Sequence, residues 1–441
     1  MRIDRFLINP DVSYNGLSIN DLDILIDKWK FLLVDKYQAK QNDTLALAIM
    51  EVNANHLALI FAVAELGMKL FLIDKPVSDV TLHMTKLGIF GPVRFGVECA
   101  TVKDLPLHHK MMETFCKTLI DENEVDDIQN YDCYDIPEDI NFHTPFLRAS
   151  TSGTTGRSKE YIYSHGEVMF TAKRNKSVFK FEEDSCVLHM RNMHHASSIL
   201  SSLFPSLMVS KNHYSVYPFV KGSANVSNET LHTIVTDVIV PKSINRVLCG
   251  SMFDVIGIME GLKEVELTVP LLLNISGFSA PKELYDATKT LPIEFISHYG
   301  AVGNAGPLLV NYIHKNSEFK ENYLGIPSED GLYVVNNTNG VTTVYSDMWK
   351  EIRPLTDNLV NEADGWYFVG RKENNVTPLR VVPCDHTVVY DDNRKYLAIW
   401  DASYTPTPIE GFDAVIKLDK QTFTVDTKIN MDQLRAYFRC L

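Results

Sequence analysis

The chain has 441 residues, of which 45% are hydrophobic, and its 42 Lys and Arg against 56 Asp and Glu give a formal net charge of −14. This composition describes a globular protein and excludes collagen-like, low-complexity and disordered chains. The acidic balance excludes a general nucleic-acid binder, because such binding requires Lys and Arg to neutralise phosphates. At about 100 to 200 residues per domain, the length predicts two to four folding units.

Cysteine usage and hydropathy predict a cytoplasmic protein. The 7 cysteines are widely scattered, and no C-x-x-C pair offers a zinc or redox site. The N-terminal sequence MRIDRFLINP lacks the apolar core of a signal peptide. The most apolar stretch, Leu57 to Ile73, contains Glu65 and Lys69, so we expect no membrane span.

The first third of the chain predicts a parallel sheet. Residues 44–50 form a short apolar run that suits a buried strand, residues 55–67 have helical length, and residues 69–74 return as a strand. Strand, helix and strand within about 30 residues make a βαβ unit. The segment 121–139 is acidic and rich in turn residues, so we expect a surface connection there rather than a metal site.

The middle third repeats this alternation. We expect apolar strands at 233–240, 271–275 and 293–297, and a helix over 251–262. The loops that follow the strands of such a sheet are where ligands usually bind.

From Asp330 the pattern changes to short strands, with a β-hairpin expected around Asn337 to Gly340. After residue 370 come further short strands and one closing helix over 430–438. We therefore predict an α/β protein with two domains. The large one, residues 1–370, combines βαβ subdomains with a β-rich subdomain, and the small α+β one spans residues 371–441.

The segment from Ala149 to Lys159, ASTSGTTGRSK, is suited to bind a polyphosphate. Its two glycines allow backbone N–H groups to converge, its hydroxyls add donors, and its lysine supplies positive charge. The residues predicted to contact ATP phosphates are Thr151, Ser152, Gly153, Thr154, Thr155, Gly156 and Lys159. The loop is not a Walker A motif, in which lysine directly follows glycine. From composition alone, a flexible linker remains the alternative.

The order TSGTTG-x-x-K resembles the signature of the adenylate-forming superfamily, which includes acyl-CoA synthetases, adenylation domains of non-ribosomal peptide synthetases and luciferases. Further segments resemble the other motifs of that family, in order, from about residue 40 to 435. In the segment RNMHHASS at 191–198, His195 matches the family histidine beside the acyl pocket. Without that context, two adjacent histidines in an apolar neighbourhood are more often packed in a core.

The resemblance implies an adenine site at the ends of two strands. Gly277, Phe278 and Ser279 match the segment that packs along adenine. Tyr299 and Gly300 match the Tyr-Gly motif whose tyrosine lies on the adenine ring, where stacking is worth about 1 to 3 kcal/mol. Plain core packing is the alternative for both aromatic residues.

Three further residues match family positions around the nucleotide. Asp357 matches the aspartate that accepts both ribose hydroxyls, and a carboxylate has the acceptors for a vicinal diol. Arg371 matches the Gly-Arg before the domain hinge, where a permanent charge suits phosphate or ribose. Lys428 matches the C-terminal lysine that bridges carboxylate and α-phosphate.

By this resemblance, the large domain binds AMP and the small domain is mobile. The implied reaction is ATP-dependent activation of a small carboxylic acid to an acyl-adenylate with release of pyrophosphate. Acyl transfer to a thiol or amine, such as CoA or a carrier protein, follows. Lys428, Lys159 and His195 are the implied catalytic residues.

The sequence departs from the family where a glutamate normally holds Mg²⁺, because Val302 and Gly303 replace Thr-Glu. We still expect ATP and Mg²⁺ as cofactors, with substrate phosphates and waters supplying most ligands and no protein ligand assigned. The missing glutamate leaves open a nucleotide-binding protein without turnover. An amino-acid-activating enzyme also stays open, although residues 191–198 lack the aspartate that would pair an ammonium group. A protein that kept only the fold is the least favoured alternative.

Overall fold

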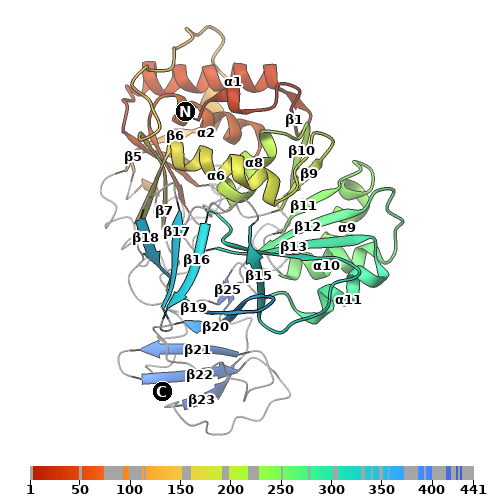
Figure 1. The fold of residues 1–441 in the computed structure, drawn as a ribbon. Helices are drawn as coiled ribbons and strands as arrows, with labels where there is room; N and C mark the ends of the chain where they lie inside the picture. Colours follow the sequence, from red (N-terminus) through yellow and green to blue (C-terminus); the bar gives the residue numbers. More distant parts are fainter. Residues whose placement is uncertain are drawn as a thin grey trace.

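The computed structural model describes residues 3–48, 52–73, 93–98, 112–113, 116–150, 160–190, 198–216, 228–249, 252–276, 279–300, 306–328, 333–338, 341–346, 351–355, 357–371, 386–391, 394–399, 414–418, 424–425 and 428–429. They form an α/β structure with two large sheets and three small ones (Figure 1). None of the helices in this described part is long and apolar enough to cross a bilayer.

The first large sheet contains the predicted βαβ unit. Within the described ranges its strand order is β6-β5-β3-β4-β7-β8, and the strands are parallel except for β8. Its strands are β3 (Thr44–Ala48), β4 (Lys69–Ile73), β5 (Val93–Glu98), β6 (Cys116–Asp121), β7 (Pro145–Ser150) and β8 (Glu160–Ser164). The predicted strands at 44–50 and 69–74 are confirmed as β3 and β4, and the predicted helix as α2 (Ala54–Glu65).

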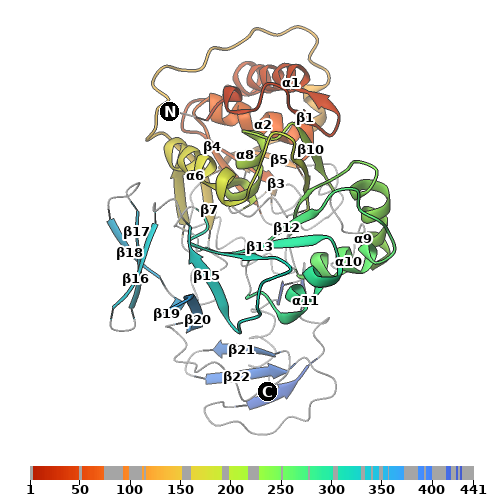
Figure 2. The same cartoon turned by 45° about the vertical axis from the view of Figure 1, so that its right-hand side comes forward.

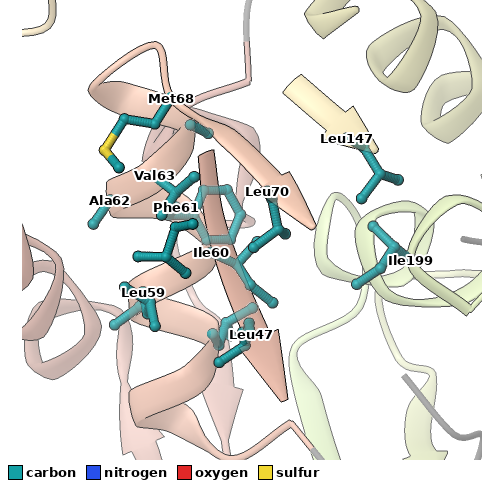
Figure 3. Packing of buried hydrophobic residues seen from close by; sticks show 14 of the residues in the cluster. Leu47, Leu59, Ile60, Phe61, Ala62, Val63, Met68, Leu70, Leu147 and Ile199 are labelled. Carbon is teal, nitrogen blue, oxygen red and sulfur yellow. The ribbon is translucent and has the colours of Figure 1, made fainter. Parts of the chain in front are cut away.

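Helix α2 begins at Asn53, whose side chain accepts a hydrogen bond from the backbone N–H of His56. Nearly all of its residues are buried, because it packs both on the sheet and against α1 (Ile19–Phe31), which covers it in Figure 1. Figure 3 shows Ile60 and Phe61 of α2 close to Leu47 of β3 and Leu70 of β4. This core holds the N-terminal sheet together.

The second large sheet crosses the middle of the molecule. Among the residues described, its order is β19-β20-β15-β14-β13-β12-β11-β9-β10-β1-β2. Its strands are β1 (Ser13–Tyr14), β2 (Leu17–Ser18), β9 (Cys186–His189), β10 (Asn212–Ser215), β11 (Arg246–Leu248), β12 (Leu271–Ser276), β13 (Ile293–Tyr299), β14 (Leu309–Ile313), β15 (Tyr323–Pro327), β19 (Asp357–Glu362) and β20 (Gly365–Arg371). The run from β1 through β10, β9, β11 and β12 to β13 is parallel.

Helices lie along both large sheets. Figure 2 shows α9 (Asn228–Ile234), α10 (Met252–Leu262) and α11 (Lys282–Thr290) beside β12 and β13. Helix α6 (His165–Val178) contacts η4 (Ile199–Leu203) and α8 (Phe204–Leu207), and these elements lie between the two sheets. The predicted helix over 251–262 and strands at 271–275 and 293–297 are confirmed as α10, β12 and β13.

The strand predicted at 233–240 is wrong. This segment continues α9 into the π-helical turn η5 (Val235–Ile239), and the strand that follows is β11. Its buried residues Leu231, Ile234 and Val235, followed by Ile239, recur at helical spacing and form one buried face. A short run of β-branched residues does not distinguish a strand from a buried helix.

The β-rich part comprises β16 (Tyr333–Thr338), β17 (Val341–Ser346) and β18 (Glu351–Pro354). The hairpin predicted around Asn337 is confirmed, because β16 and β17 are antiparallel and Thr338 pairs with Val341. Beyond residue 371, β21 (His386–Asp391), β22 (Arg394–Ile399) and β23 (Ala414–Lys417) form one small sheet. It lies at the opposite end of the molecule from α1 (Figure 1). The helix predicted over 430–438 lies outside the described residues.

Candidate active site

The centre of the candidate site is a contact between Tyr299 and Asp357. Tyr299 is the last residue of β13, and Asp357 is the first residue of β19. The tyrosine hydroxyl donates a hydrogen bond of 2.7 Å to Oδ2 of Asp357 across 58 positions of sequence. Both side chains are half-buried, so a ligand can still reach them. The fold thus joins the predicted adenine and ribose positions directly.

Arg371 lies beside this pair. It is the last residue of β20, and the antiparallel register of β19 and β20 places it opposite Asp357. Beneath the pair, Leu359 and Trp366 are buried in an apolar cluster, and the Tyr299 side chain packs against that cluster. The backbone of Arg371 is therefore paired with the residue that the Tyr299 hydroxyl contacts.

The chain turns back sharply after Tyr299. The backbone N–H of Leu308 donates a 2.7 Å hydrogen bond to the carbonyl oxygen of Tyr299. A Cβ atom on Gly300 would lie 2.7 Å from the carbonyl oxygen of Gly306, which is closer than real Cβ contacts. Gly306 has φ +134°, a conformation that favours glycine. The Gly300 predicted from sequence is thus required by the shape of this turn.

Ser279 follows β12, the parallel neighbour of β13. The register pairs Ser276 with His298, so both strands end at the same edge of the sheet. His298 is buried there, and its Nδ1 lies 3.1 Å from Oδ1 of Asn274 on β12. Ligands in α/β sheets bind at such carboxyl ends. The arrangement agrees with a binding role for Ser279.

Ten of the predicted residues lie outside the described part of the chain. They are Thr151, Ser152, Gly153, Thr154, Thr155, Gly156, Lys159, His195, Gly277 and Phe278. The elements on either side are described: β7 ends at Ser150 and β8 begins at Glu160, and these two residues pair in antiparallel register. The predicted phosphate loop is therefore the connection between two adjacent strands.

Lys428 belongs to a separate short hairpin. It begins β25 (Lys428–Ile429) and pairs with Val425 of β24 (Thr424–Val425). Its catalytic role stays a prediction.

No protein-family model matches the chain, and no curated protein sequence matches it. Solved structures do. O-succinylbenzoate coenzyme A synthetase from Bacillus subtilis, in complex with AMP, superposes with a TM-score of 0.73 at 15% identity over 99% of this chain and 96% of that chain. An anthranilate CoA ligase in complex with anthranoyl-AMP gives a TM-score of 0.72 at 13% identity over 96% and 93%.

The fold is that of the adenylate-forming enzymes. The match extends over nearly the whole of both chains, so it covers both large sheets and the β-rich part. The N-terminal domain of FACL13 from Mycobacterium tuberculosis matches with a TM-score of 0.69 at 15% identity, over 84% of this chain and 100% of that domain. The predicted fold class and the resemblance are confirmed at the level of fold.

This adenylate-forming fold contains a buried histidine pair that sequence analysis missed. His189 ends β9, and its Nε2 lies 3.2 Å from Nδ1 of His213 on β10. Tyr14 of β1 stacks on both rings at centroid distances of 6.0 Å. Burial lowers the pKa of His213 to about 4, and burial together with His213 lowers the pKa of His189 well below its usual value. Both rings are therefore neutral at pH 7.

A second buried pair lies at the start of the segment 121–139, which was predicted to be a surface connection. Glu122, in η3 (Glu122–Val125), is buried, and its Oε2 lies 2.7 Å from Nε2 of His56 in α2. The histidine gives this carboxylate a partner away from water. The residues around 129–139 are mostly exposed, as predicted. One acidic residue among several in an acidic segment gives no sequence signal of such a pairing.

Within the described ranges, no group of three or more His, Cys, Asp or Glu side chains could hold a metal ion. This part of the chain therefore supplies no Mg²⁺ cage.

Proposed function

We propose that this protein is an adenylate-forming ligase that activates a carboxylic acid with ATP and then transfers the acyl group to a thiol. The observation that carries the proposal is the contact between Tyr299 and Asp357 in this fold, with Arg371 paired to Asp357 across β19 and β20. An aromatic ring, a carboxylate and a permanent cation suit adenine, a ribose diol and phosphate respectively.

The structural neighbours support acyl or aryl acids as substrates. One is named as an O-succinylbenzoate CoA synthetase, with structures that hold ATP and magnesium ion or an acyl-adenylate intermediate, and another as an anthranilate CoA ligase. We propose a small carboxylic acid of this kind as substrate and CoA as the acceptor. The alternative acceptors that the sequence leaves open are a carrier protein and another amine or thiol. The alternative substrate is an amino acid.

In the proposed first step, a carboxylate oxygen attacks the α-phosphorus of ATP. A new P–O bond forms, the bond from the α-phosphorus to the bridging oxygen breaks, and pyrophosphate leaves with the electron pair. In the second step a thiolate attacks the acyl carbon and AMP leaves. Catalysis is mainly positioning and charge neutralisation, so we assign Lys159 and Lys428 to the phosphates and Asp357 to the ribose.

Magnesium ion would supply further positive charge at the phosphates. The described residues do not provide a carboxylate cage for it, and Gly303 stands at the family's glutamate position. We therefore assign no catalytic step to the metal. Gly303 also favours a second candidate function, a nucleotide-binding protein without turnover.

We propose two domains, residues 1–370 and 371–441, with a hinge near Arg371. The match of an isolated N-terminal domain to 84% of this chain supports this division. The small sheet of β21 to β23 and the hairpin of β24 and β25 belong to the second domain. Swinging this domain would exchange Lys428 for an acceptor-binding face.

We also propose a cytoplasmic location. None of the four described cysteines forms a disulfide, which agrees with a reducing compartment.

ATP–[³²P]pyrophosphate exchange tests the proposed activity. Pools of aliphatic, aromatic and amino acids would be compared in the parent protein, in Lys428→Ala, and in Lys282→Ala, which removes an exposed helix lysine. We expect exchange with one pool of non-amino acids, loss in Lys428→Ala and retention in Lys282→Ala. ATP binding without exchange from any pool would support the second candidate function instead.

A further inference from the structure

The hydroxyl of Tyr299 has a role that stacking on a base does not explain. Its hydrogen bond to Oδ2 of Asp357 is 2.7 Å long, within the usual range for a hydroxyl donor and a carboxylate acceptor. A phenyl ring without the hydroxyl would stack on adenine equally well. The hydroxyl therefore acts on the carboxylate of Asp357 and not on the base.

The tyrosine is the more rigid partner of this pair. Its carbonyl oxygen accepts from Leu308, and its strand position pairs with Leu309 of β14. Its ring packs against the buried cluster that includes Leu359 and Trp366. A side chain held at both its backbone and its ring can fix the orientation of a shorter side chain.

Asp357 needs such a fixed orientation if it binds a ribose. A carboxylate has about four lone-pair sites, and two hydroxyls of a vicinal diol are recognised together only when its plane has one orientation. The backbone of Asp357 is set by its register with Arg371, and the hydrogen bond from Tyr299 restrains rotation about its side-chain bonds.

We propose that Tyr299 is a positioning residue, whose hydroxyl orients the Asp357 carboxylate toward a ribose diol and so sets the preference for ribonucleotides over deoxyribonucleotides. This proposal rests on the proposed function, because it assumes ATP at this site. It assigns the tyrosine two separable roles, with the ring on the base and the hydroxyl on the carboxylate.

The test is calorimetric titration of ATP and 2′,3′-dideoxyATP into the parent, Tyr299→Phe, Asp357→Asn and the double variant. Tyr312→Phe is the matched control, because it removes a hydroxyl from the adjacent strand β14, where Tyr312 donates to the carbonyl of Val178. We expect Tyr299→Phe to bind ATP about 5- to 20-fold more weakly and dideoxyATP unchanged. The double variant should bind ATP only slightly more weakly than Tyr299→Phe, since both substitutions disrupt the same interaction with the ribose.

Equal ATP affinity in Tyr299→Phe and the parent, or tighter binding in the variant because the hydroxyl competes with ribose, would overturn the positioning role. If the parent itself binds no ATP, the proposed function fails as well. If the parent binds ATP and Tyr299→Phe keeps the full ribose preference, the positioning role alone fails.

Discussion

Gly300 lies so close to Gly306 that a Cβ atom on Gly300 would come within 2.7 Å of the Gly306 carbonyl oxygen. A backbone carbonyl cannot move aside as the end of a flexible side chain can. A Cβ atom added to Gly306 would lie 3.2 Å from Thr171 and 3.3 Å from Asn175 of α6, so a side chain at residue 306 would be crowded as well. The position of Tyr299 therefore depends on the absence of a side chain at residue 300.

Gly300→Ala should move the end of β13 and weaken ATP binding about tenfold or more, since small displacements at a binding site are costly. It should also lower the free energy of unfolding by about 1 to 3 kcal/mol. Gly16→Ala is the control: Gly16 has φ +88° and no atom within 4 Å of its Cβ position, so only the strain is introduced. That variant should lose stability while ATP affinity stays unchanged, and equal ATP affinity in both variants would contradict the account.

The buried ion cluster of the N-terminal region gives a prediction about stability. Glu65 is fully buried at the end of α2, and its carboxylate accepts from Arg5 at 2.8 and 2.9 Å and from Lys30 at 3.1 Å. Glu65→Gln would remove the fully buried carboxylate that Arg5 and Lys30 share, although both also lie near Asp27. It should lower the free energy of unfolding by about 3 kcal/mol.

The control for that variant is Asp286→Asn on α11, where exposed Lys282 and Lys289 pair with the carboxylate. Exposed pairs of this kind contribute little, so denaturant unfolding of this variant should match the parent. If Glu65→Gln and Asp286→Asn had the same free energy of unfolding, the buried cluster would contribute no more to stability than the exposed pairs.

The stacked histidines predict acid sensitivity. Because His213 has a pKa of about 4 when folded and about 6.5 when unfolded, only the unfolded chain gains a proton there between these values. Its contribution to stability is complete above pH 6.5 and is lost as the pH falls toward 4, a change of about 3 kcal/mol. His189 acts in the same direction, because its pKa is also lowered by burial.

Urea unfolding of the parent and of His213→Gln, from pH 7.5 down to 4, measures this contribution. Carboxylates titrate in the same range, so the informative quantity is the difference between the two proteins. We expect that difference to shrink as the pH falls. A difference that stays constant over the whole range would show that His213 does not carry the effect.

Gly303 predicts a gain of metal affinity on substitution. Gly303→Glu would return a carboxylate to the family's position, and hard cations prefer such oxygen ligands. The Mg²⁺ concentration that half-saturates pyrophosphate exchange should fall in this variant by about fivefold or more. Gly303→Ala is the control, because it adds a side chain without charge. Equal Mg²⁺ dependence of exchange in the parent and both variants would show that residue 303 does not affect Mg²⁺ binding.

Much of the fold follows from local pattern, and the site does not. The βαβ unit could be predicted directly from the lengths and hydrophobic patterns of its parts. These are the short apolar runs at β3 and β4 and the helix-length apolar run at α2. The helical segment at 233–240 could not, since its β-branched residues suit both a strand and a buried helix face.

The site depends on long-range contacts. Tyr299 and Asp357 were each matched to a family motif, but nothing in either motif indicates that the two side chains touch. The pairing of His189 with His213 depends on the parallel register of β9 and β10, which only the assembled sheet fixes. Likewise, the Glu122–His56 pair needs the packing of α2 against the segment after β6.

The most direct test of the central claim is trapping with hydroxylamine. The protein would be incubated with ATP, Mg²⁺, hydroxylamine and the acid pool that drives exchange, and AMP, ADP, pyrophosphate and hydroxamate would be quantified. We predict AMP, pyrophosphate and hydroxamate in equal amounts, because hydroxylamine intercepts an acyl-adenylate. ADP and phosphate in place of AMP and pyrophosphate, or nucleotide binding with no acid-dependent AMP from any pool, would contradict an adenylate-forming ligase.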